Sequence, residues 1–286
     1  YREENMSVKD KIYRGIKYIF KGVPNVYVSA KIVTSSPNNT LEKRKIIVTG
    51  GSRGLGYDIA KKCVEEGADV LITGRNKESL MKAKRSLGEK CQYICWDIAD
   101  VAHIDDFLET AAAKLGGIPD SLINNAGVSL HEGTFQDVTE ESFDTQININ
   151  LKGTYFLTNK FCKMLMDSDK KVNGNVIMMT SERGLYGDDI PYGLTKAAIV
   201  SYTKGMARRL INYGIRVNAI APGVTASDMT GYKKDGNLYR EQACGKRAFL
   251  GEEIAECALF LLRDVSGCIS GQVIACNQGN HLRSDW

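Results

Sequence analysis

The sequence of 286 residues predicts an α/β protein, a doubly wound parallel sheet of seven strands with helices on both faces. Three observations carry this prediction. From Lys45 onward, short apolar runs alternate with stretches that have the spacing of amphipathic helices. A glycine-rich turn over residues 50–56 follows the first apolar run, and residues 1–43 differ from the rest in charge and pattern. The hydrophobic content of 43% and the charged content of 25% are ordinary for a globular protein.

The expected strands are short runs rich in Ile, Val and other apolar side chains. A strand buried on both faces of a parallel sheet shows such a continuous apolar run instead of alternation. The first run ends directly at the glycine turn, as a strand leading into a phosphate-binding loop would. In chain order, the expected strands are Lys45–Thr49, Ala68–Thr73, Cys91–Cys95, Ser121–Asn124, Asn175–Thr180, Ile215–Ile220 and Gln272–Ala275.

Between these strands, apolar residues recur every three to four positions, which predicts helices. The expected helices cover about residues 54–66, 76–87, 101–115, 140–167, the segment with Tyr192 and Lys196, and 252–263. The stretch 140–167 is expected to form one long helix. Because single α/β domains reach about 250 residues, residues 44–286 are predicted to form one domain. Residues 1–43 are then an N-terminal extension.

The extension is basic. Residues 1–45 hold ten Lys and Arg against four Asp and Glu, whereas the remainder of the chain is close to neutral. Lys9–Lys21 has apolar residues at helical spacing among its cations, which predicts a basic amphipathic helix, and residues 35–39 resemble a linker. Two interpretations stay open: the helix packs on the body or a neighbouring subunit, or it binds a membrane surface or an acidic partner. The near-neutral body argues against nucleic acid as a partner.

The composition argues against a metal site and against membrane insertion. The eight cysteines are scattered, and the closest pair, Cys91 and Cys95, lacks the two-residue gap of zinc and redox motifs. None of the three histidines lies near a cysteine pair, so no metal is expected. Reduced, mostly buried thiols in a cytoplasmic protein are the expectation. No run of about 20 apolar residues and no signal peptide is recognisable.

The turn after the first strand has the pattern Thr-Gly-x-x-x-Gly-x-Gly, with glycines at Gly50, Gly54 and Gly56. Glycine permits a tight turn and lets a pyrophosphate approach the backbone, while the N-terminus of the next helix offers N–H groups. Glycine can also serve any strand-to-helix turn. The position between an expected strand and an expected helix favours a dinucleotide site, with Ser52, Arg53 and Leu55 in the same loop.

Tyr192 and Lys196 are four residues apart, so on a helix they share one face. A nearby ammonium lowers the pKa of a phenol from its ordinary value near 10, which makes a proton donor for carbonyl reduction. A tyrosine–lysine pair of this spacing is also common on protein surfaces. Ser181 ends the preceding strand and favours the catalytic interpretation. Thr180 is the competing hydroxyl, but it is expected to face the other side of the strand.

These motifs resemble those of the short-chain dehydrogenase/reductase family, whose fold is of the Rossmann type. The resemblance covers about residues 44–280, and the matching pieces occur in the family's order. They are Thr49–Gly56, Asp97, Asn124–Gly127, Asn150, Ser181, Tyr192 with Lys196, and Pro222–Gly223. The resemblance implies an oxidoreductase that uses a nicotinamide cofactor.

The resemblance also implies roles for four residues. Tyr192 would donate the proton to the substrate oxygen as hydride arrives. Lys196 would lower the pKa of Tyr192 and bond the nicotinamide ribose, and Ser181 would orient the carbonyl. Asn150 would hold a water that relays protons toward Lys196, and its register before Leu151 favours it over Asn148.

The cofactor expected is NADP(H), with NAD(H) as the less favoured choice. NAD enzymes usually place Asp or Glu at the end of the second strand, and this chain has Thr73-Gly74-Arg75 there. Arg75 and Arg53 could hold a 2′-phosphate, unless both are simply solvated surface residues. The expected cofactor contacts are Gly50, Ser52, Arg53, Gly54, Leu55, Gly56, Arg75, Asn76, Asp97, Ile98, Asn124, Ala126, Gly127, Tyr192, Lys196, Pro222, Gly223, Val224 and Thr225.

The substrate expected is a small polar carbonyl or alcohol, namely a keto-sugar, a polyol or a sugar acid. Glu182-Arg183-Gly184 follow the serine where the family often has apolar residues, and Asp188-Asp189 lie in the next loop. The Ser-Glu-x-Gly piece weakly resembles gluconate 5-dehydrogenases. The lid, about residues 224–248, is aromatic and basic. Alternatively, Glu182 and Arg183 contact each other in a subunit interface.

Three further expectations complete the hypothesis. The alternative function is that of a 3-oxoacyl-carrier-protein reductase, in which the basic helix would dock an acidic carrier. A non-enzymatic alternative is an NADP-binding regulator or scaffold. The resemblance implies a homo-oligomer, a tetramer or a dimer, that buries residues 140–167 and the Tyr192 helix. Residues 277–280 depart from the family's frequent paired glycine, so the contacts of the C-terminal segment stay open.

Overall fold

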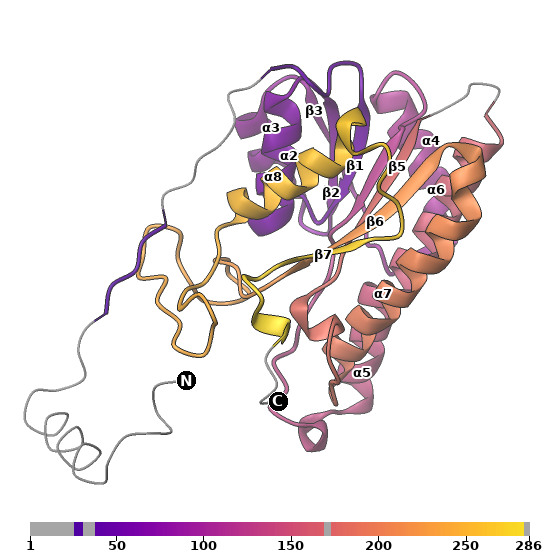
Figure 1. Cartoon of the computed structure of the whole chain (residues 1–286). Coiled ribbons are helices and arrows are strands. Elements are labelled where there is room, and N and C mark those ends of the chain that lie inside the picture. Colours follow the sequence, from indigo (N-terminus) through magenta and orange to yellow (C-terminus); the bar gives the residue numbers. More distant parts are fainter. Residues whose placement is uncertain (1–25, 31–37, 169–172, 283–286) are drawn as a thin grey trace, which may run out of the picture.

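The computed structural model describes residues 26–30, 38–168 and 173–282. Its centre is a parallel sheet with the strand order β3-β2-β1-β4-β5-β6-β7 (Figure 1). The strands are β1 Lys45–Thr49, β2 Asp69–Gly74, β3 Cys91–Cys95, β4 Ser121–Asn124, β5 Gly174–Met179, β6 Ile215–Pro222 and β7 Val273–Cys276. The expected doubly wound sheet is therefore confirmed.

The helices cover both faces of the sheet. They are α2 Gly54–Glu65, α3 Lys77–Leu87, α4 Ile104–Lys114, α5 Glu140–Gln146, α6 Thr154–Met166, α7 Pro191–Leu210 and α8 Gly251–Leu262. Helices α2, α3 and α8 pack on one face, and α4, α6 and α7 pack on the other (Figure 1). No helix in the described residues is long and apolar enough to cross a membrane.

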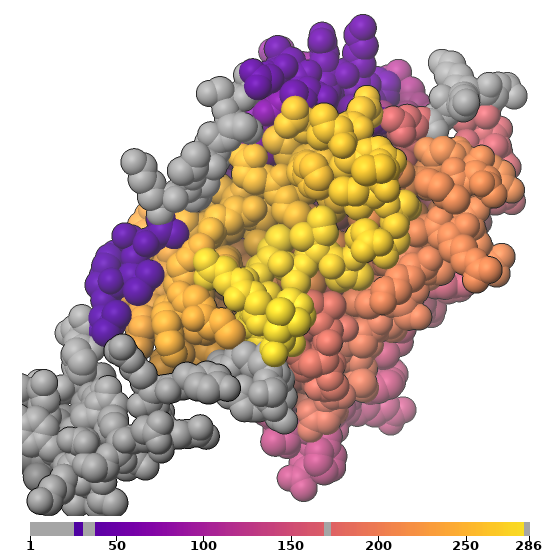
Figure 2. Space-filling model, in the orientation of Figure 1, coloured from indigo at the N-terminus to yellow at the C-terminus, as the bar shows by residue number. Residues whose placement is uncertain are grey.

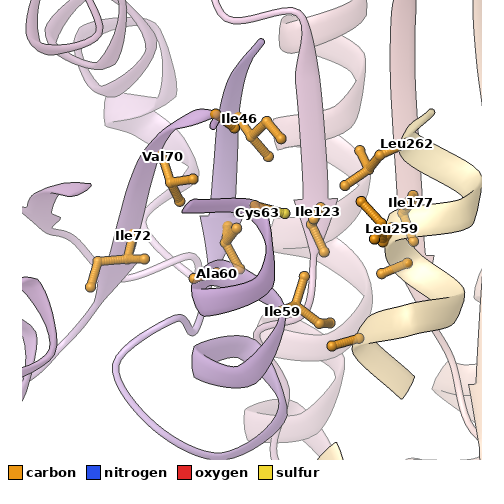
Figure 3. Close-up of a cluster of buried hydrophobic side chains, with 14 of the residues drawn as sticks. Ile46, Ile59, Ala60, Cys63, Val70, Ile72, Ile123, Ile177, Leu259 and Leu262 are labelled. Atoms are coloured by element: carbon orange, nitrogen blue, oxygen red, sulfur yellow. The ribbon is translucent and has the colours of Figure 1, made fainter. Parts of the chain in front are cut away.

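The strands supply both halves of the core because successive side chains point to opposite faces. Ile46 and Val48 of β1 pack under α2 and α8, whereas Ile47 faces α4 and α6. Figure 3 shows the first of these clusters, in which Ile59 of α2 and Leu259 of α8 approach the sheet. Burying an aliphatic side chain of this size contributes about 1.5–3 kcal/mol, so the strand ends are held firmly by the core.

The segment expected as one helix over residues 140–167 is interrupted. Between α5 and α6 lies a π-helical segment, Ile147–Gly153. Two contacts explain the widened turn. The side chain of Asn150 bonds to the backbone of Val128, and Gly153 lies so close to Ile98 that an added Cβ would be 2.3 Å from the Ile98 oxygen. The prediction of an uninterrupted helix is therefore wrong, and the interruption sits at a residue singled out for catalysis.

Little of the N-terminal extension belongs to the described residues. The amphipathic helix expected at residues 9–21 lies outside them. Val26–Ala30 is described and lies against the lid, beside the loop that follows β6 (Figures 1 and 2). Leu41, just before β1, is buried and belongs to the core under α2. The chain therefore packs against the core at Leu41, before strand β1 begins.

Candidate active site

The order of the sheet places a groove at the carboxyl ends of its strands. Strand β1 lies between β2 and β4, so the loops after β1 and β4 diverge there and leave a crevice. This cavity, here called the strand-end groove, has a volume of about 970 Å³. The predicted site residues that line it are Gly50, Ser52, Arg53, Gly54, Leu55, Gly56, Arg75, Asn76, Asp97, Ile98, Ala126, Gly127, Ser181, Tyr192, Lys196, Pro222, Gly223 and Thr225.

The glycine turn is shaped by backbone that other residues would distort. Gly50 and Gly54 have φ angles of +66° and +54°, a region that favours glycine. A Cβ at Gly56 would be 2.4 Å from both Asn125 Nδ2 and Gly50 O. Arg53, the N-cap residue of α2, makes no side-chain capping hydrogen bond, so the first N–H groups of α2 are available to an anion in the described part of the chain. The turn therefore suits a pyrophosphate.

Asn125, rather than its neighbour Asn124, braces this turn. Asn125 Nδ2 donates to Thr49 O at 2.9 Å and to Gly50 O at 3.2 Å. Asn124 is 3% exposed, and its amide donates to Thr158 Oγ1, away from the groove. Asn125 lines the groove, whereas Asn124, its neighbour at the strand end, faces the opposite side. The expected cofactor contact at Asn124 is corrected accordingly.

The end of the strand-end groove at the glycine turn also carries unused polar groups. Thr73 Oγ1 and Trp96 Nε1 are buried, line the groove and have no hydrogen-bond partner among the described residues. Asn76 accepts a hydrogen bond from Ser79 N at 2.8 Å and thereby caps α3. Buried polar atoms are normally satisfied, so the two orphans point to a polar ligand at this end. The glycine turn and these atoms together fit a nicotinamide dinucleotide.

Two arginines lie at this end, and their surroundings differ. Arg53 pairs with Asp228 of the lid at 3.2 Å, and both side chains are more than three-quarters exposed. Arg75 makes no side-chain hydrogen bond or ion pair in the described part of the chain and also lines the groove. An exposed pair such as Arg53–Asp228 contributes little and opens easily. Both guanidinium groups are therefore accessible to a ligand.

Tyr192, Lys196 and Ser181 meet at the middle of the strand-end groove. Tyr192 and Lys196 occupy the first turns of α7, and Lys196 Nζ is 5.6 Å from the centre of the Tyr192 ring. Ser181 follows β5 in an extended conformation and lines the groove. The competing hydroxyl of Thr180 donates to Lys196 O at 2.8 Å and is thereby occupied. One face of α7 and the end of β5 thus bring the expected trio together.

Electrostatics at this trio differ from the expectation. Burial raises the pKa of Tyr192, and the hydrogen bond with Ser181 and the charge of Arg183 oppose that rise. Lys196 Nζ donates to Met179 O at 2.9 Å, and burial lowers the pKa of Lys196 to about 8. The expected lowering of the Tyr192 pKa by Lys196 is therefore not found in this geometry. Tyr192 is a neutral phenol near pH 7, which is the form that can donate a proton.

Asn150 lies one layer behind the groove. Its Oδ1 accepts from Val128 N at 2.8 Å, and its Nδ2 donates to Val128 O at 2.8 Å. Gly127 separates it from Lys196, since a Cβ there would be 3.3 Å from Asn150 Oδ1 and 3.4 Å from Lys196 Nζ. Asn150 therefore holds the loop after β4 in place beside Lys196. Its expected role in a water relay stays a prediction.

A second cavity of about 880 Å³, here called the charged cavity, adjoins Ser181 and Tyr192. Its lining includes residues from the loops at 129–131 and 181–189 and from the lid. Val224, expected at the cofactor, lines this cavity instead. Arg183 donates to both carboxylate oxygens of Asp188, whose side chain is only 2% exposed. Asp188 also accepts from Ile190 N at 3.2 Å, so it fixes the loop that leads into α7.

Glu182 connects two segments that depart from the family pattern, namely the residues after Ser181 and residues 277–280. Its Oε2 accepts hydrogen bonds from Asn277 Nδ2 at 3.1 Å and Asn280 Nδ2 at 3.0 Å. The side chain is buried, and no ion pair with Arg183 occurs among the described residues. The alternative Glu182–Arg183 contact does not form within the described part of the chain. The residue after the serine and the unusual C-terminal asparagines, far apart in the sequence, are hydrogen-bond partners.

Some lining residues were not predicted near the site, and others were predicted only as part of the lid. Ser129, Leu130 and His131 follow β4 and belong to the first group, whereas Ser227–Thr230 lie within the predicted lid of residues 224–248. Asn125 could have been found from strand alternation, because Asn124 ends a buried run. The lid residues carry no local motif, and only the fold brings them over the groove. No cluster of His, Cys, Asp or Glu that could hold a metal occurs in the described ranges.

Comparisons with known proteins agree with this geometry. The family model for short chain dehydrogenases matches residues 44–237. The chain is 33% identical to 3-oxoacyl-[acyl-carrier-protein] reductase of Thermotoga maritima over 248 residues, 84% of this chain and 98% of the relative. It is 34% identical to the enzyme of the same name from Chlamydia trachomatis over 252 residues, again 84% and 98%.

Solved structures give the same picture. The 3-ketoacyl-(acyl-carrier-protein) reductase from Brucella melitensis, complexed with NADH, superposes with a TM-score of 0.78 at 26% identity, covering 84% of this chain and 99% of that chain. A short chain dehydrogenase from Bacillus anthracis superposes with a TM-score of 0.76 at 30% identity, covering 86% and 99%. Each of these similarities covers 84–86% of the present chain.

Proposed function

This chain belongs to the short-chain dehydrogenase/reductase family and is an oxidoreductase; from that premise we propose that it uses NADP(H) to interconvert a carbonyl and a secondary alcohol on a small polar keto-sugar, polyol or sugar acid. The observation that carries the proposal is the meeting of two cavities at Tyr192. The strand-end groove reaches Tyr192 from the glycine turn, and the charged cavity reaches it from the lid.

The proposed roles of this chain's residues follow from their contacts. NADP(H), when bound, supplies or accepts the hydride. Tyr192 donates the proton to the carbonyl oxygen, which the raised pKa permits because the phenol is protonated at neutral pH. Ser181, hydrogen-bonded with Tyr192, orients that oxygen. Lys196 and Asn150 lie on either side of Gly127. Lys196 bonds the ribose of the nicotinamide, and Asn150 supports the path of protons toward Lys196.

The preference for NADP(H) rests on the residues at the end of β2. Arg75 and Asn76 stand where an enzyme that prefers NAD usually has an acidic side chain. Arg75 is accessible, and Arg53 is held only by an exposed pair with Asp228. Two guanidinium groups at this place favour a 2′-phosphate through charge-assisted hydrogen bonds.

A second candidate function is that of a 3-oxoacyl-[acyl-carrier-protein] reductase. The names of the relatives from Thermotoga maritima and Chlamydia trachomatis favour it. The charged cavity favours the first candidate, because an acyl chain would bury apolar surface against charged residues such as Arg183, Asp189 and Arg240. The basic extension remains a proposed docking element for an acidic partner or a membrane surface.

We further propose a homodimer or homotetramer in the cytoplasm. The outer faces of α5, α6 and α7 expose large apolar side chains, which on a soluble protein mark an interaction surface. They are Phe143, Tyr155, Phe156 and Leu194, each 42–47% exposed. All eight cysteines are free, in keeping with a reducing compartment.

The test is NADPH and NADH oxidation with a panel of ketoses, keto-sugar acids and 3-oxoacyl thioesters, with Tyr192→Phe as the control. We expect turnover of polar ketones with NADPH that is lost in Tyr192→Phe. Turnover confined to the thioesters would favour the second candidate. Tight NADPH binding without turnover of any substrate would favour a regulator or scaffold.

A further inference from the structure

Arg240 is a cation of the charged cavity for which the described part of the chain supplies no partner. Arg183 is neutralised by its two hydrogen bonds with Asp188. Arg240 of the lid lines the same cavity, and its guanidinium has no hydrogen bond or ion pair among the described residues. Its charge reaches as far as Tyr186, where it counteracts the rise of the tyrosine pKa. Arg240 is only partly exposed, so this charge is not simply solvated.

The carboxylates of the cavity are not available to Arg240 in the same way. Glu182 accepts from two asparagine amides, and Asp188 is held by Arg183. Asp189 is exposed, and solvent and salt screen its charge. A guanidinium presents a planar fork of donors that is suited to a carboxylate, and Arg240 does so in the cavity that Ser181 and Tyr192 also line.

The backbone of Arg240 is fixed although its side chain is not. Arg240 N donates to Lys246 O at 3.0 Å, and Ala243 N donates to Arg240 O at 3.2 Å. Tyr239 and Arg247 form an antiparallel bridge next to them. A guanidinium on a fixed backbone loses less freedom on binding than one on a mobile loop.

We propose that Arg240 binds a carboxylate of the substrate, so that the substrate is a keto acid or the corresponding hydroxy acid. Its ketone carbon, or the carbon that bears the hydroxyl, lies at Tyr192. This inference rests on the proposed function, because it takes the reacting carbon to be the one beside Tyr192 and Ser181. It narrows the polar substrates considered above to acids, and it makes Arg240 the residue that separates acids from neutral ketoses.

The test compares a keto-sugar acid with the neutral ketose of the same length, in the wild type and in Arg240→Gln. We expect the KM for the acid to rise about tenfold or more in Arg240→Gln, as the loss of a charge-assisted hydrogen bond predicts. The kcat for the acid and both constants for the ketose should stay within about twofold. The matched control is Lys246→Gln, because Lys246 donates to Glu241 O in the same lid and does not line the cavity.

Equal effects of Arg240→Gln on acid and ketose, or no effect on either, would overturn the inference. A preference of the wild type for a ketose phosphate over the keto acid would overturn it as well. If the wild type turns over no substrate, the proposed function fails, and calorimetric binding of the keto acid to the NADPH-loaded protein then tests Arg240 by itself. Binding that is equal in the wild type and Arg240→Gln would contradict the inference there.

A different observation concerns the extension. Val26–Ala30, here called the strap, pairs with the lid just before Arg240 (Figures 1 and 2). The side chain of Asn237 joins the two segments, because its Oδ1 accepts from Val28 N at 3.0 Å and its Nδ2 donates to Val26 O at 2.9 Å. Leu238 N donates to Val28 O at 3.0 Å. Ala30 packs on the buried lid residues Leu238, Ala248 and Leu250.

The geometry points to the strap as a positioning element for the lid. Asn237 Oδ1 also accepts from Tyr239 N at 2.9 Å, so the contact that holds the strap also shapes the chain leading to Arg240. The strap precedes residue 44, where the family match begins. A segment added to the family domain therefore stabilises the part of the molecule that covers the charged cavity.

Val28→Pro tests the strap in the full chain, because proline removes the N–H that donates to Asn237. Val28→Ala keeps that N–H and is the matched control. We expect Val28→Pro to increase protease cleavage within residues 230–247 about tenfold and to raise KM more than it lowers kcat, with the thermal midpoint of the domain unchanged. Cleavage and kinetics equal to those of Val28→Ala would overturn the inference.

Discussion

The strand-end groove and the charged cavity meet at Tyr192, yet they are built in different ways. The groove is formed where strands end, and backbone and glycine supply most of its surface, as at Gly50 and Gly56. The charged cavity is formed by loops and the lid, and pairs of side chains hold it, as Arg183 holds Asp188. The strap adds a further contact on the side of the cavity only.

This difference has a physical consequence. Where backbone forms the site, a substitution that adds atoms is the most damaging, because the packed sheet behind the backbone cannot make room for them. Where buried polar pairs form the site, a substitution that removes one partner is the most damaging, because the other partner is left without a hydrogen bond. The groove should therefore tolerate changes of surface charge, and the cavity should not tolerate changes of its buried pairs.

The largest expected effect is at Tyr192, one of the residues that line both cavities. Tyr192→Phe removes the proton donor and should lower kcat by about 10²–10⁴-fold, as loss of general acid catalysis does. NADPH binding, measured by fluorescence titration, should stay within about twofold of the wild type. If NADPH binding were lost as well, Tyr192 would have a structural role in the groove and the comparison of two separate halves would break down.

Lys196 gives the next effect on stability, and the size of this effect depends on pH. Burial lowers the pKa of Lys196 to about 8 from its ordinary value of 10.5, so the unfolded chain binds the proton more tightly. The resulting penalty is full below pH 8 and disappears as the pH rises above 10.5. The pKa shift corresponds to a penalty of about 3 kcal/mol. The hydrogen bond from Lys196 to Met179 O stabilises the folded protein by about 1 kcal/mol, and a substitution of Lys196 removes both contributions.

Lys196→Met should therefore raise the free energy of unfolding by about 2 kcal/mol at pH 7 while it abolishes turnover. Urea denaturation at pH 7 and at pH 10 measures this, and the gain should shrink at the higher pH. Lys204→Met, on the exposed part of α7, is the control and should change stability by less than about 0.5 kcal/mol. A Lys196→Met protein less stable than the wild type at pH 7 would contradict the expected sign.

Glu182→Leu tests the buried pairs of the charged cavity. It removes the single oxygen, Oε2, that accepts from both Asn277 and Asn280, so both donors lose their acceptor. We expect a loss of about 1–3 kcal/mol in the free energy of unfolding and faster proteolysis after residue 276, with NADPH binding unchanged. Asp189→Asn, in the same loop but exposed, should be within about 0.5 kcal/mol of the wild type.

The smallest expected effect is a change of surface charge at the groove. Arg75→Gln should reduce the preference for NADPH over NADH about tenfold, because one charge-assisted contact with the 2′-phosphate is lost. Arg85→Gln, on the outer face of α3, should leave the preference unchanged. Steady-state kinetics with both cofactors measure this. An unchanged preference in Arg75→Gln would remove the main support for NADP(H).

The fold could be predicted closely because buried parallel strands are continuous apolar runs. Strands β1, β3 and β4 have the bounds that the sequence predicts, and the other strands differ by one or two residues at their ends. The break in the helix at Ile147–Gly153 could not be predicted, since its cause is a contact between Asn150 and the distant Val128. Periodicity describes a helix by itself and contains nothing about such a partner.

The candidate site divides in the same way. Tyr192, Lys196 and Ser181 are close in sequence and lie on one helix face and one strand end, so spacing was enough to bring them together. Glu182 was expected beside the substrate, but it bonds to asparagines about a hundred positions later. Sequence reasoning located the charges of the cavity and could not tell which of them are already paired.

The contact of Glu182 with the C-terminal asparagines has a consequence for sequence comparison. Neither side of this contact is useful without the other, since a lone buried carboxylate or lone amides would lack partners. Substitutions at these three positions should therefore be accepted in evolution only together. Among family members, a glutamate directly after the serine should co-occur with asparagine at the positions of Asn277 and Asn280, and such covariation would mark a lineage that shares this arrangement of the C-terminal segment.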